Sequence, residues 1–252
     1  MSTKDFLKKI KDEDIEYVDV RFTDTRGKLQ HVTIVSDLVD EDFVEEGFMF
    51  DGSSIAGWKS IEASDMKLML DTDTAYVDPF YAEKTICVHC SVVEPDTGEA
   101  YERDPRGTAQ KAEAYLKASG IGDVAYMGPE AEFFLFDNVK FSNSINKVSY
   151  EVDASDASWN TDTDYEMGNM GHRPGLKGGY FPVNPTDEAQ DLRAEMLSTM
   201  KRLGMKVDKH HHEVASCQHE LGLIFGTLTE QADELQKYKY VIHNVAHAYG
   251  KS

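Results

Sequence analysis

Hydrophobic and polar residues alternate along much of the first hundred positions, and this period of two predicts β-strands. Strand-like segments at residues 17–22 and 29–34 flank the polar stretch TDTRGK, in which Gly27 suits a turn with positive φ. These segments predict a β-hairpin. The strand-like runs MKLML, TAYVDPF and TICVHCSVV follow, and then the turn-rich stretch EPDTGEAYERDPRG. We expect a domain boundary in that stretch, near residue 104.

The pattern then changes to the 3.6-residue period of helices. Residues 108–120 place apolar side chains at helical spacing and end in glycine, a favourable C-cap, before the strand-like run VAYMGPEAEFFLF. Thr186 is predicted to cap a second helix, and Thr229 a third. The second helix repeats apolar residues every fourth position: Leu192, Met196 and Met200. Each of the first two helices leads into strand-like sequence, which predicts an α/β second part. Residues 138–179 lack periodicity and predict a long functional loop region.

Composition makes the chain an ordinary globular protein with an acidic surface. Its 252 residues are 40% hydrophobic and carry a formal net charge of −20, with only short cationic clusters. We therefore expect no nucleic-acid partner and no anionic-membrane partner, since both require a basic surface. No apolar run resembles a signal peptide or a membrane span, so we expect a cytoplasmic protein. A site for an anionic substrate would need metal cations or arginines to offset the acidic charge.

Three sequence features that resemble known motifs do not fit them. Cys87 and Cys90 form a lone C-x-x-C in a strand-like run, where their side chains would point to opposite faces, which argues against a zinc or redox site. The terminal GKS lacks the first glycine of a phosphate-binding loop, because Val245 occupies that position. The run HHHE cannot place consecutive histidines on one metal if it is a strand.

Carboxylates next to apolar strands are the strongest chemical signal. Glu130 and Glu132 would share a face of one strand, Glu213 would share a face with His211 on a second, and Glu220 begins a third. A solvated strand face is the alternative explanation for each motif taken alone. If the three strands are neighbours, four carboxylates converge and require cations between them. Oxygen ligands with perhaps one imidazole favour Mg²⁺ or Mn²⁺ over zinc, and such ions suit phosphates.

Two further segments have the composition of binding loops. FMFDGSSIAGW surrounds Asp51 with large apolar residues, a setting suited to a small cation, although Asp-Gly-Ser-Ser is also an ordinary turn. GNMGHRPGLKGGYFPV combines glycines with His172, Arg173 and Lys177, and could bind an anion or be an ordinary surface loop.

Taken together, these segments resemble bacterial class I glutamine synthetases. FMFDGSSIAGW, GPEAEFFLFD, GNMGHRPGLKGGYFPV and HHHEVASCQHELGLIF occur in this order and at these separations, and the similarity includes YERDPRGTAQKAEAYL and KYKYVIHNVAHAYGKS. The resemblance implies an α+β fold, with a β-grasp domain over residues 1–104 and part of the family's α/β barrel-like catalytic domain over 105–252. It also implies a homo-oligomer of two hexameric rings, in which the active sites form between the catalytic domain of one subunit and the N-terminal domain of the next.

The resemblance implies that the protein joins glutamate and ammonia at the expense of ATP, through a γ-glutamyl phosphate and with two divalent cations, Mg²⁺ or Mn²⁺. Glu132, Glu213 and Glu220 would hold the metal nearer the substrate glutamate. Glu130 would contribute to the other metal, which binds the ATP phosphates. No protein nucleophile is needed, so Cys217, beside the metal motif, is expected to be a small buried filler.

For ammonium and ATP the resemblance assigns two further groups of residues. Asp51 matches the family's ammonium-site aspartate, and Ser54, Tyr180 and Glu213 would complete that pocket. The catalytic roles then belong to Asp51, which could accept a proton from ammonium, and Glu213. For ATP, Phe225 matches an aromatic residue that packs on adenine. Asp208 stands where many members have a nucleotide-contacting glutamate. The aspartate side chain is shorter and therefore reaches less far toward the nucleotide.

A full family member continues for nearly as long again. The resemblance implies that the glutamate-binding loop, a histidine and a glutamate of the metal sites, the flap and the phosphate-binding arginines lie beyond this chain, whose barrel would be incomplete. We therefore expect little or no synthetase activity from these 252 residues alone. Two alternatives remain open: a γ-glutamyl ligase for another amine, and a non-catalytic truncated subunit.

Overall fold

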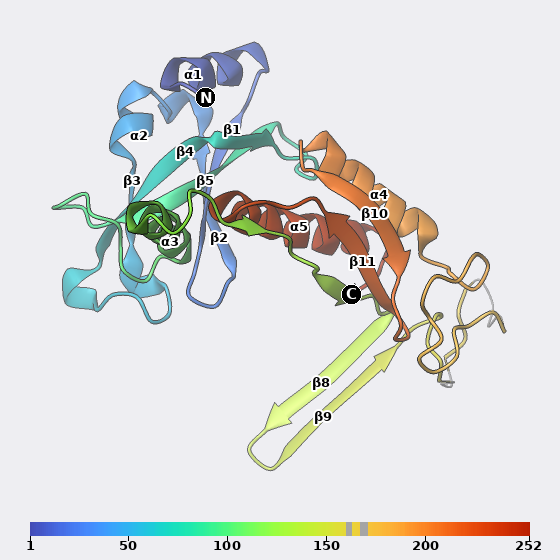
Figure 1. Ribbon diagram of the computed structural model, residues 1–252. Helices are drawn as coiled ribbons and strands as arrows, with labels where there is room; N and C mark the ends of the chain where they lie inside the picture. The colour runs from blue at the N-terminus through green and yellow to red at the C-terminus, as the bar shows by residue number, and fades with distance from the viewer. Residues whose placement is uncertain (160–162, 167–170) are drawn as a thin grey trace. The chain divides into compact units, whose positions relative to one another are not determined.

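The computed structural model describes residues 1–159, 163–166 and 171–252. They form two compact units (Figure 1). Unit 1 comprises Met1–Met127 and Gly226–Gln236, and unit 2 comprises Gly128–Phe225 and Lys237–Ser252. Helix α5, Leu228–Ala248, contributes its first residues to unit 1 and the remainder to unit 2. Among the described residues, no helix combines the length and the apolar character that crossing a membrane requires.

Unit 1 is built on a five-stranded sheet in the order β2-β1-β5-β4-β3. Strands β1 and β5 are parallel, and the other neighbouring pairs are antiparallel. The predicted hairpin around Gly27, whose φ is 76°, is confirmed. The strands are β1 Tyr17–Thr23, β2 Leu29–Val35, β3 Phe48–Asp51, β4 Asp65–Val77 and β5 Thr85–Val93. MKLML and the first four residues of TAYVDPF, which the pattern presents as two strands, belong to the single long strand β4.

One face of this sheet carries the apolar core of unit 1. Side chains of β1 and β5 pack there with Phe6 and Ile10 of α1, Thr3–Asp12, and with Val44 of α2, Glu41–Glu46. Ser2 caps α1 and Asp40 caps α2, each by accepting a hydrogen bond from a backbone N–H. Three short 3₁₀ helices complete this part: η1 Ser36–Leu38, η2 Gly52–Ser54 and η3 Ile61–Ala63.

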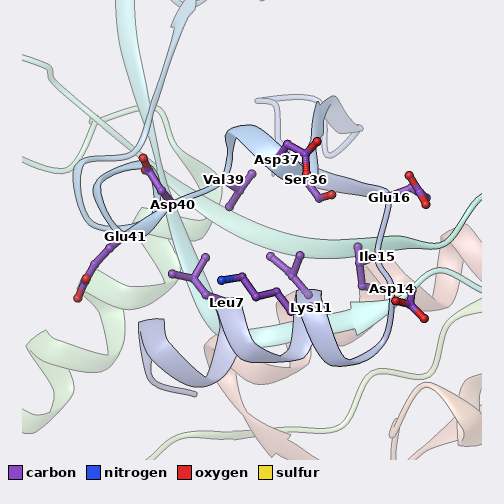
Figure 2. Close-up of a pocket in the computed structure, with 11 residues that line it drawn as sticks. Leu7, Lys11, Asp14, Ile15, Glu16, Ser36, Asp37, Val39, Asp40 and Glu41 are labelled. Atoms are coloured by element: carbon purple, nitrogen blue, oxygen red, sulfur yellow. The ribbon is translucent and has the colours of Figure 1, made fainter.

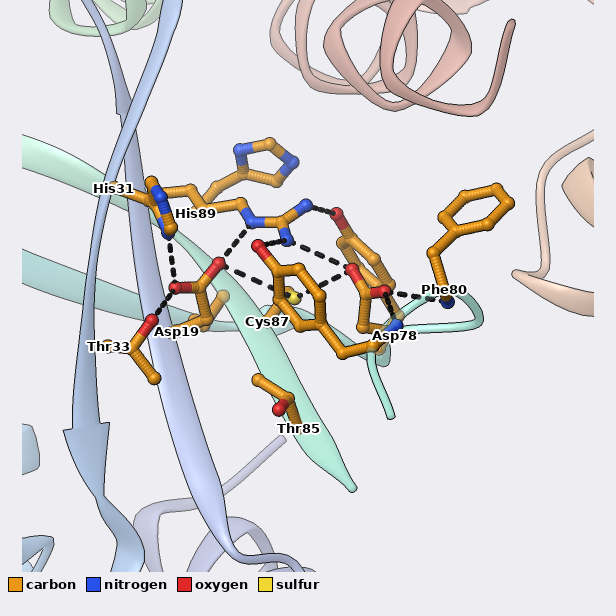
Figure 3. A network of polar contacts seen from close by, with 12 residues as sticks. Asp19, His31, Thr33, Asp78, Phe80, Thr85, Cys87 and His89 are labelled. Atoms are coloured by element: carbon orange, nitrogen blue, oxygen red, sulfur yellow. Dashed lines mark hydrogen bonds and ion pairs between the residues drawn. The ribbon is translucent and has the colours of Figure 1, made fainter. Parts of the chain in front are cut away.

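The opposite face of the sheet holds a buried polar network centred on Arg21 (Figure 3). Its guanidinium donates to Asp19 Oδ2 at 2.6 Å, to Tyr76 Oη at 2.7 Å and to Asp78 Oδ2 at 3.0 Å. Cys87 also lies on this face, with its Sγ 3.5 Å from Asp78 Oδ2. Cys90, by contrast, belongs to the apolar core. The two cysteines therefore point to opposite faces, as the strand period predicts.

Helix α3, Pro105–Ser119, follows in unit 1. Asp104 caps its start, and Gly120 ends it with φ 70°, as predicted. Arg106 in its first turn binds Asp233 of α5, with Nη2 2.9 Å from Asp233 Oδ2. The short strand β6, Tyr126–Met127, pairs with β12, Gly226–Thr227.

Unit 2 contains a three-stranded antiparallel sheet in the order β10-β11-β7. The strands are β10 Val207–His212, β11 Gln218–Leu223 and β7 Glu132–Phe134. Helix α4, Gln190–Arg202, packs on this sheet, mainly against β10, and buries its predicted core residues Leu192, Met196 and Met200. The α+β class predicted from the sequence is confirmed.

Four local predictions are corrected. VAYMGPEAEFFLF is not one strand: β6 and β7 belong to different sheets, and Pro129 between them has no backbone N–H to donate. Thr186 does not cap α4, whose N-cap residue is Ala189. Thr229 lies inside α5, which begins at Leu228. Residues 138–153 are not loop: β8, Asn138–Ser144, and β9, Lys147–Asp153, form a regular hairpin that extends away from the β10–β11 strands (Figure 1).

Candidate metal centre

The unit 2 sheet aligns acidic and imidazole side chains from three strands. Glu220 on β11 is the direct cross-strand partner of Glu132 on β7 and of His211 on β10. Residues paired in this way have neighbouring side chains on the same face of a sheet. The three predicted strands are therefore neighbours, and their register brings Glu132, His211 and Glu220 to one face. Glu213, predicted to lie on the second strand, instead follows the last residue of β10.

His211 and Glu220 form a tight cluster with Glu213. Each of His211, Glu213 and Glu220 offers one potential ligand atom, and these atoms all lie within 4.8 Å of one another. His211 Nδ1 is 3.3 Å from Glu213 Oε1, and its Nε2 is 3.5 Å from Glu220 Oε2. Both glutamates are 8% exposed. Burial raises the pKa of Glu220, and the nearby charges of Glu213 and Glu130 raise it further.

The other two carboxylates lie at the margin of this cluster. Glu132 and Glu130 are exposed, and Glu132 accepts a hydrogen bond from the Gln218 side chain. Glu130 precedes β7, so the strand itself does not hold both glutamates on one face as predicted. Its charge nevertheless acts on Glu220.

The donor set fits a hard divalent cation. Two buried carboxylates and an imidazole already face one point, with Glu132 as cross-strand neighbour of Glu220. A buried carboxylate with a raised pKa is one whose charge lacks sufficient compensation, and a cation supplies that compensation. Mainly oxygen donors with one nitrogen suit Mn²⁺ or Mg²⁺.

The neighbouring histidines point to the other face of the sheet. His212 Nε2 lies 2.8 Å from Asp156 Oδ2, and its Nδ1 lies 2.6 Å from the Glu213 carbonyl oxygen. His219 Nδ1 lies 3.1 Å from Arg193 Nη1. His212, His219 and Asp156 thus form a second cluster, on the opposite face from Glu220. Because protein groups already contact the ring nitrogens named above, this cluster is a buried hydrogen-bond network. Burial and the adjacent Arg193 charge lower the pKa of His219 to about 2. The sequence analysis missed this network, although His212 and His219 alternate with the proposed ligands.

An aromatic pair lies beside the cluster of His211, Glu213 and Glu220. The rings of Tyr180 and Phe181 stack at 3.9 Å between centroids, and both meet the ring of His211 edge-on, at 5.7 Å and 4.7 Å. Gly179 anchors the segment, because its N–H donates to the Val214 carbonyl oxygen at 3.1 Å. Tyr180 therefore lies near Glu213, while Phe181 had no assigned role from the sequence.

Asp51 and Ser54 belong to unit 1. Asp51 ends β3 and is exposed, and its carboxylate accepts hydrogen bonds from the hydroxyls of Ser53 at 2.6 Å and Ser54 at 2.9 Å. These bonds lower the pKa of Asp51. The loop's large apolar side chains turn inward instead: Trp58 is 5% exposed and packs on Phe22 and Phe50.

Phe225 and Asp208, which are predicted to bind the nucleotide, lie at the opposite end of the unit 2 sheet from Glu132 and Glu220. Phe225 follows β11 and is 62% exposed, so much of its surface is accessible to a flat ligand. Asp208 is exposed on β10 and packs closely against Gly222 of β11.

The glycine-rich segment has a different arrangement from a simple anion loop. Residues 168–170 lie outside the described residues. His172 and Lys177 are exposed, but Arg173 donates to the Trp159 carbonyl oxygen at 3.0 Å. The guanidinium of Arg173, one of the positive charges of this segment, is thus hydrogen-bonded to the backbone of unit 2.

Unit 1 also has a groove of about 690 Å³ between α1 and residues 36–41 (Figure 2). Leu7, Ile15 and Val39 contribute apolar surface, while carboxylates such as Asp37 and Glu41 border it. None of the site residues predicted from the sequence lines this groove. The chemistry therefore concentrates at the carboxylate cluster and not at this cavity.

Comparisons with known proteins show the family of the chain and agree with its fold. The family model "Glutamine synthetase, catalytic domain" matches residues 102–252, and "Glutamine synthetase, beta-Grasp domain" matches 14–95. The chain is 77% identical to glutamine synthetase of Cereibacter sphaeroides, over 98% of this chain and 53% of the relative. It is 74% identical to that of Rhodobacter capsulatus, over 100% of this chain and 57% of the relative. It thus spans about half the length of these curated relatives.

Among solved structures, the cryo-EM structure of Plasmodium falciparum glutamine synthetase matches with a TM-score of 0.92 and 24% identity. The match covers 100% of this chain and 50% of that one. At this identity the likeness concerns the fold.

Proposed function

The chain belongs to the glutamine synthetase family, and from this premise we propose that it carries metal, ammonium and nucleotide sites for ATP-dependent ligation of glutamate and ammonia. The reaction would proceed through a γ-glutamyl phosphate. The observation that carries the proposal is the cluster of His211, Glu213 and Glu220 beside Glu132, a set of donors suited to Mg²⁺ or Mn²⁺. The division into a domain over residues 1–104 and another over 105–252 is part of the same proposal.

The carboxylates would bind two cations. Glu132, Glu213 and Glu220 would hold the one nearer the substrate glutamate, and Glu130 would contribute to the one that binds the ATP phosphates. Bound divalent cations neutralise phosphate charge, so that a carboxylate can attack the terminal phosphorus in line. The chain's own part is to fix the donors on strands β7 and β11 and next to β10, and to limit the access of water to Glu213 and Glu220.

Ammonium would be bound by Asp51 and Ser54 together with Tyr180 and Glu213. The lowered pKa of Asp51 keeps it anionic, which favours attraction of NH₄⁺. Proton removal to release NH₃ would then depend on Asp51 and Glu213 together. We propose, on the family resemblance, that the pocket forms between the N-terminal domain of one subunit and the catalytic domain of the next.

Exposed apolar side chains support an oligomer. On the hairpin β8–β9, Phe141 is 81% exposed, Val148 75% and Tyr150 80%. Such a contiguous apolar surface is typical of an assembly interface. We propose a homo-oligomer of the double-ring type, in the cytoplasm where ATP and glutamate are available.

For the nucleotide, we propose that the exposed ring of Phe225 packs against adenine and that Asp208 contacts the nucleotide through its carboxylate. Asp208 is the shorter acid, so a bridging water would extend its reach.

Titration of the purified chain with Mn²⁺, followed by the loss of the free-ion electron paramagnetic resonance signal, tests the metal assignment. Glu220→Gln should weaken binding at least about tenfold, because it removes an anionic ligand. The matched control Glu151→Gln removes an equal charge from the exposed hairpin and should leave the affinity unchanged. Equal affinity of both variants would exclude this cluster as the metal site.

The amine specificity is tested with the same protein, supplied with ATP, glutamate, Mn²⁺ and either ammonium or a polyamine. ADP release and the ligated product are measured together. Product formed only with a polyamine would contradict the ammonium assignment of Asp51 and Ser54. Glutamine formed at a substantial rate would show that these residues suffice for catalysis.

A further inference from the structure

The segment Gly179–Tyr180–Phe181 lies against the imidazole of His211. Phe181 presents its ring to His211 at 4.7 Å between centroids with an interplanar angle of 75°. Tyr180 stacks on Phe181 at 3.9 Å and meets His211 at 73°. Two aromatic rings thus border the imidazole that stands between Glu213 and Glu220.

The backbone of this segment is held in an unfavourable conformation. Phe181 has φ 60°, a left-handed value that bulky aromatic residues rarely adopt. Its ring is nevertheless 57% exposed, so burial of the side chain does not account for that conformation. Exposed residues kept in strained conformations are concentrated at functional sites.

Gly179 explains how the segment approaches so closely. A Cβ at this position would lie 2.5 Å from the Glu213 carbonyl oxygen and 2.7 Å from the ring of His212. Only glycine therefore fits, and the segment is fastened directly to the backbone of a proposed metal ligand. Phe181 N–H also points to the His212 carbonyl oxygen, at 3.5 Å.

We propose that Phe181 is a positioning residue of the metal centre, whose ring, backed by Tyr180, fixes the His211 imidazole between Glu213 and Glu220. The inference rests on the proposed function, because it concerns the same metal cluster. Edge-to-face contacts with aromatic rings restrict the rotation of an imidazole. A fixed imidazole in turn restricts the two carboxylates beside it, and groups that orient metal ligands affect metal affinity about 10- to 100-fold.

The test compares Mn²⁺ affinities of the intact chain and its variants by paramagnetic resonance titration. Phe181→Leu should weaken binding about tenfold, and Phe181→Tyr, which keeps the ring, should restore it. Phe141→Leu is the matched control, because it removes the same ring from the exposed hairpin of the same unit.

A further variant separates positioning from general stability. Glycine adopts positive φ without strain, so Phe181→Gly should unfold at the same temperature as Phe181→Leu or higher. It should nevertheless bind Mn²⁺ as weakly as Phe181→Leu. In histidine-selective NMR spectra, the ring resonances of His211 should shift in Phe181→Leu and not in Phe141→Leu, with His211→Gln identifying the signal.

The outcomes distinguish failure of the proposed metal site from failure of the proposed role of Phe181. If the unaltered chain binds no Mn²⁺, the proposed metal site itself fails. If the unaltered chain binds Mn²⁺ and Phe181→Leu or Phe181→Gly retains its affinity, the metal site stands and the positioning role of Phe181 is refuted.

Discussion

Replacing Arg21 with methionine should strongly destabilise unit 1. Arg21 is 2% exposed, and its guanidinium is the cation that offsets Asp19 and Asp78, whose side chains are fully buried. Burial alone would lower the pKa of Arg21, but Tyr76, Cys87 and Asp19 raise it overall, so the guanidinium stays protonated. Methionine keeps an unbranched apolar stem but has no guanidinium, so the substitution removes the charge and its hydrogen bonds.

The expected loss in the free energy of unfolding depends on the buried carboxylates of Asp19 and Asp78, which the substitution leaves without their cation. Removing one partner of a buried ion pair costs about 3–5 kcal/mol, because the other charge stays buried without compensation. Asp19 retains hydrogen bonds from Thr33 at 2.7 Å and a contact with His31 at 2.6 Å. Asp78 retains the backbone N–H of Phe80 at 2.8 Å. These remaining partners place the expected loss at about 3 kcal/mol, at the lower end of the range.

Urea unfolding followed by tryptophan fluorescence measures this loss. The chain has two tryptophans, and a Trp159→Phe background leaves Trp58, whose ring is 5.5 Å from that of Phe22 in the unit 1 core, as the reporter. The control Arg26→Met removes an exposed arginine from the β1–β2 turn and should change the free energy of unfolding by less than about 0.5 kcal/mol.

A loss below about 1 kcal/mol for Arg21→Met would refute the reasoning, since it would mean that the two carboxylates are not effectively buried. Adding Asp19→Asn and Asp78→Asn to Arg21→Met should recover part of the stability. The triple variant no longer contains an uncompensated buried charge.

Three further predictions concern unit 2 and the Asp51 loop. Gly179→Ala should cost about 1–3 kcal/mol in urea unfolding, because its Cβ meets the Glu213 carbonyl oxygen at 2.5 Å, and an unchanged stability would contradict this packing. Burial raises the pKa of the Cys217 thiol to about 12, so at pH 8 it should react with a disulfide reagent only after unfolding; rapid labelling of the native chain would argue against that burial. Ser53→Ala should raise the pKa of Asp51 toward its usual value in a carbon-13 NMR titration, and no change would show that this hydroxyl does not stabilise the carboxylate.

Local pattern predicted those elements whose two faces differ in polarity. The β1–β2 hairpin, α3 with its glycine cap and the buried stripe of α4 follow from periods of 2 and 3.6 residues. The hairpin β8–β9 was missed although apolar and polar residues alternate along both of its strands: Phe141, Val148 and Tyr150 share one face, and that face is exposed. The break between β6 and β7 was missed because apolar residues continue on both sides of Pro129.

The candidate site, too, was predicted from the sequence only in part. Sequence spacing marked the glutamates of three strands and required a cation if those strands were neighbours. The order β10-β11-β7 and the pairing of Glu220 with both Glu132 and His211 are long-range features, set by which strands pair and in which register. No local pattern contains that information.

The sequence by itself determined the family, the class of fold and the residue types at the proposed metal centre, because these depend on composition, spacing and motif order along the chain. Tertiary structure decided which charges became buried. Arg21 and Arg193 are ordinary polar residues in the sequence, yet both are buried: Arg21 against Asp78, 57 residues along the chain, and Arg193 against His219, 26 residues along. A charge leaves water only where distant segments bring its partners to it, and that proximity exists only once the chain has folded.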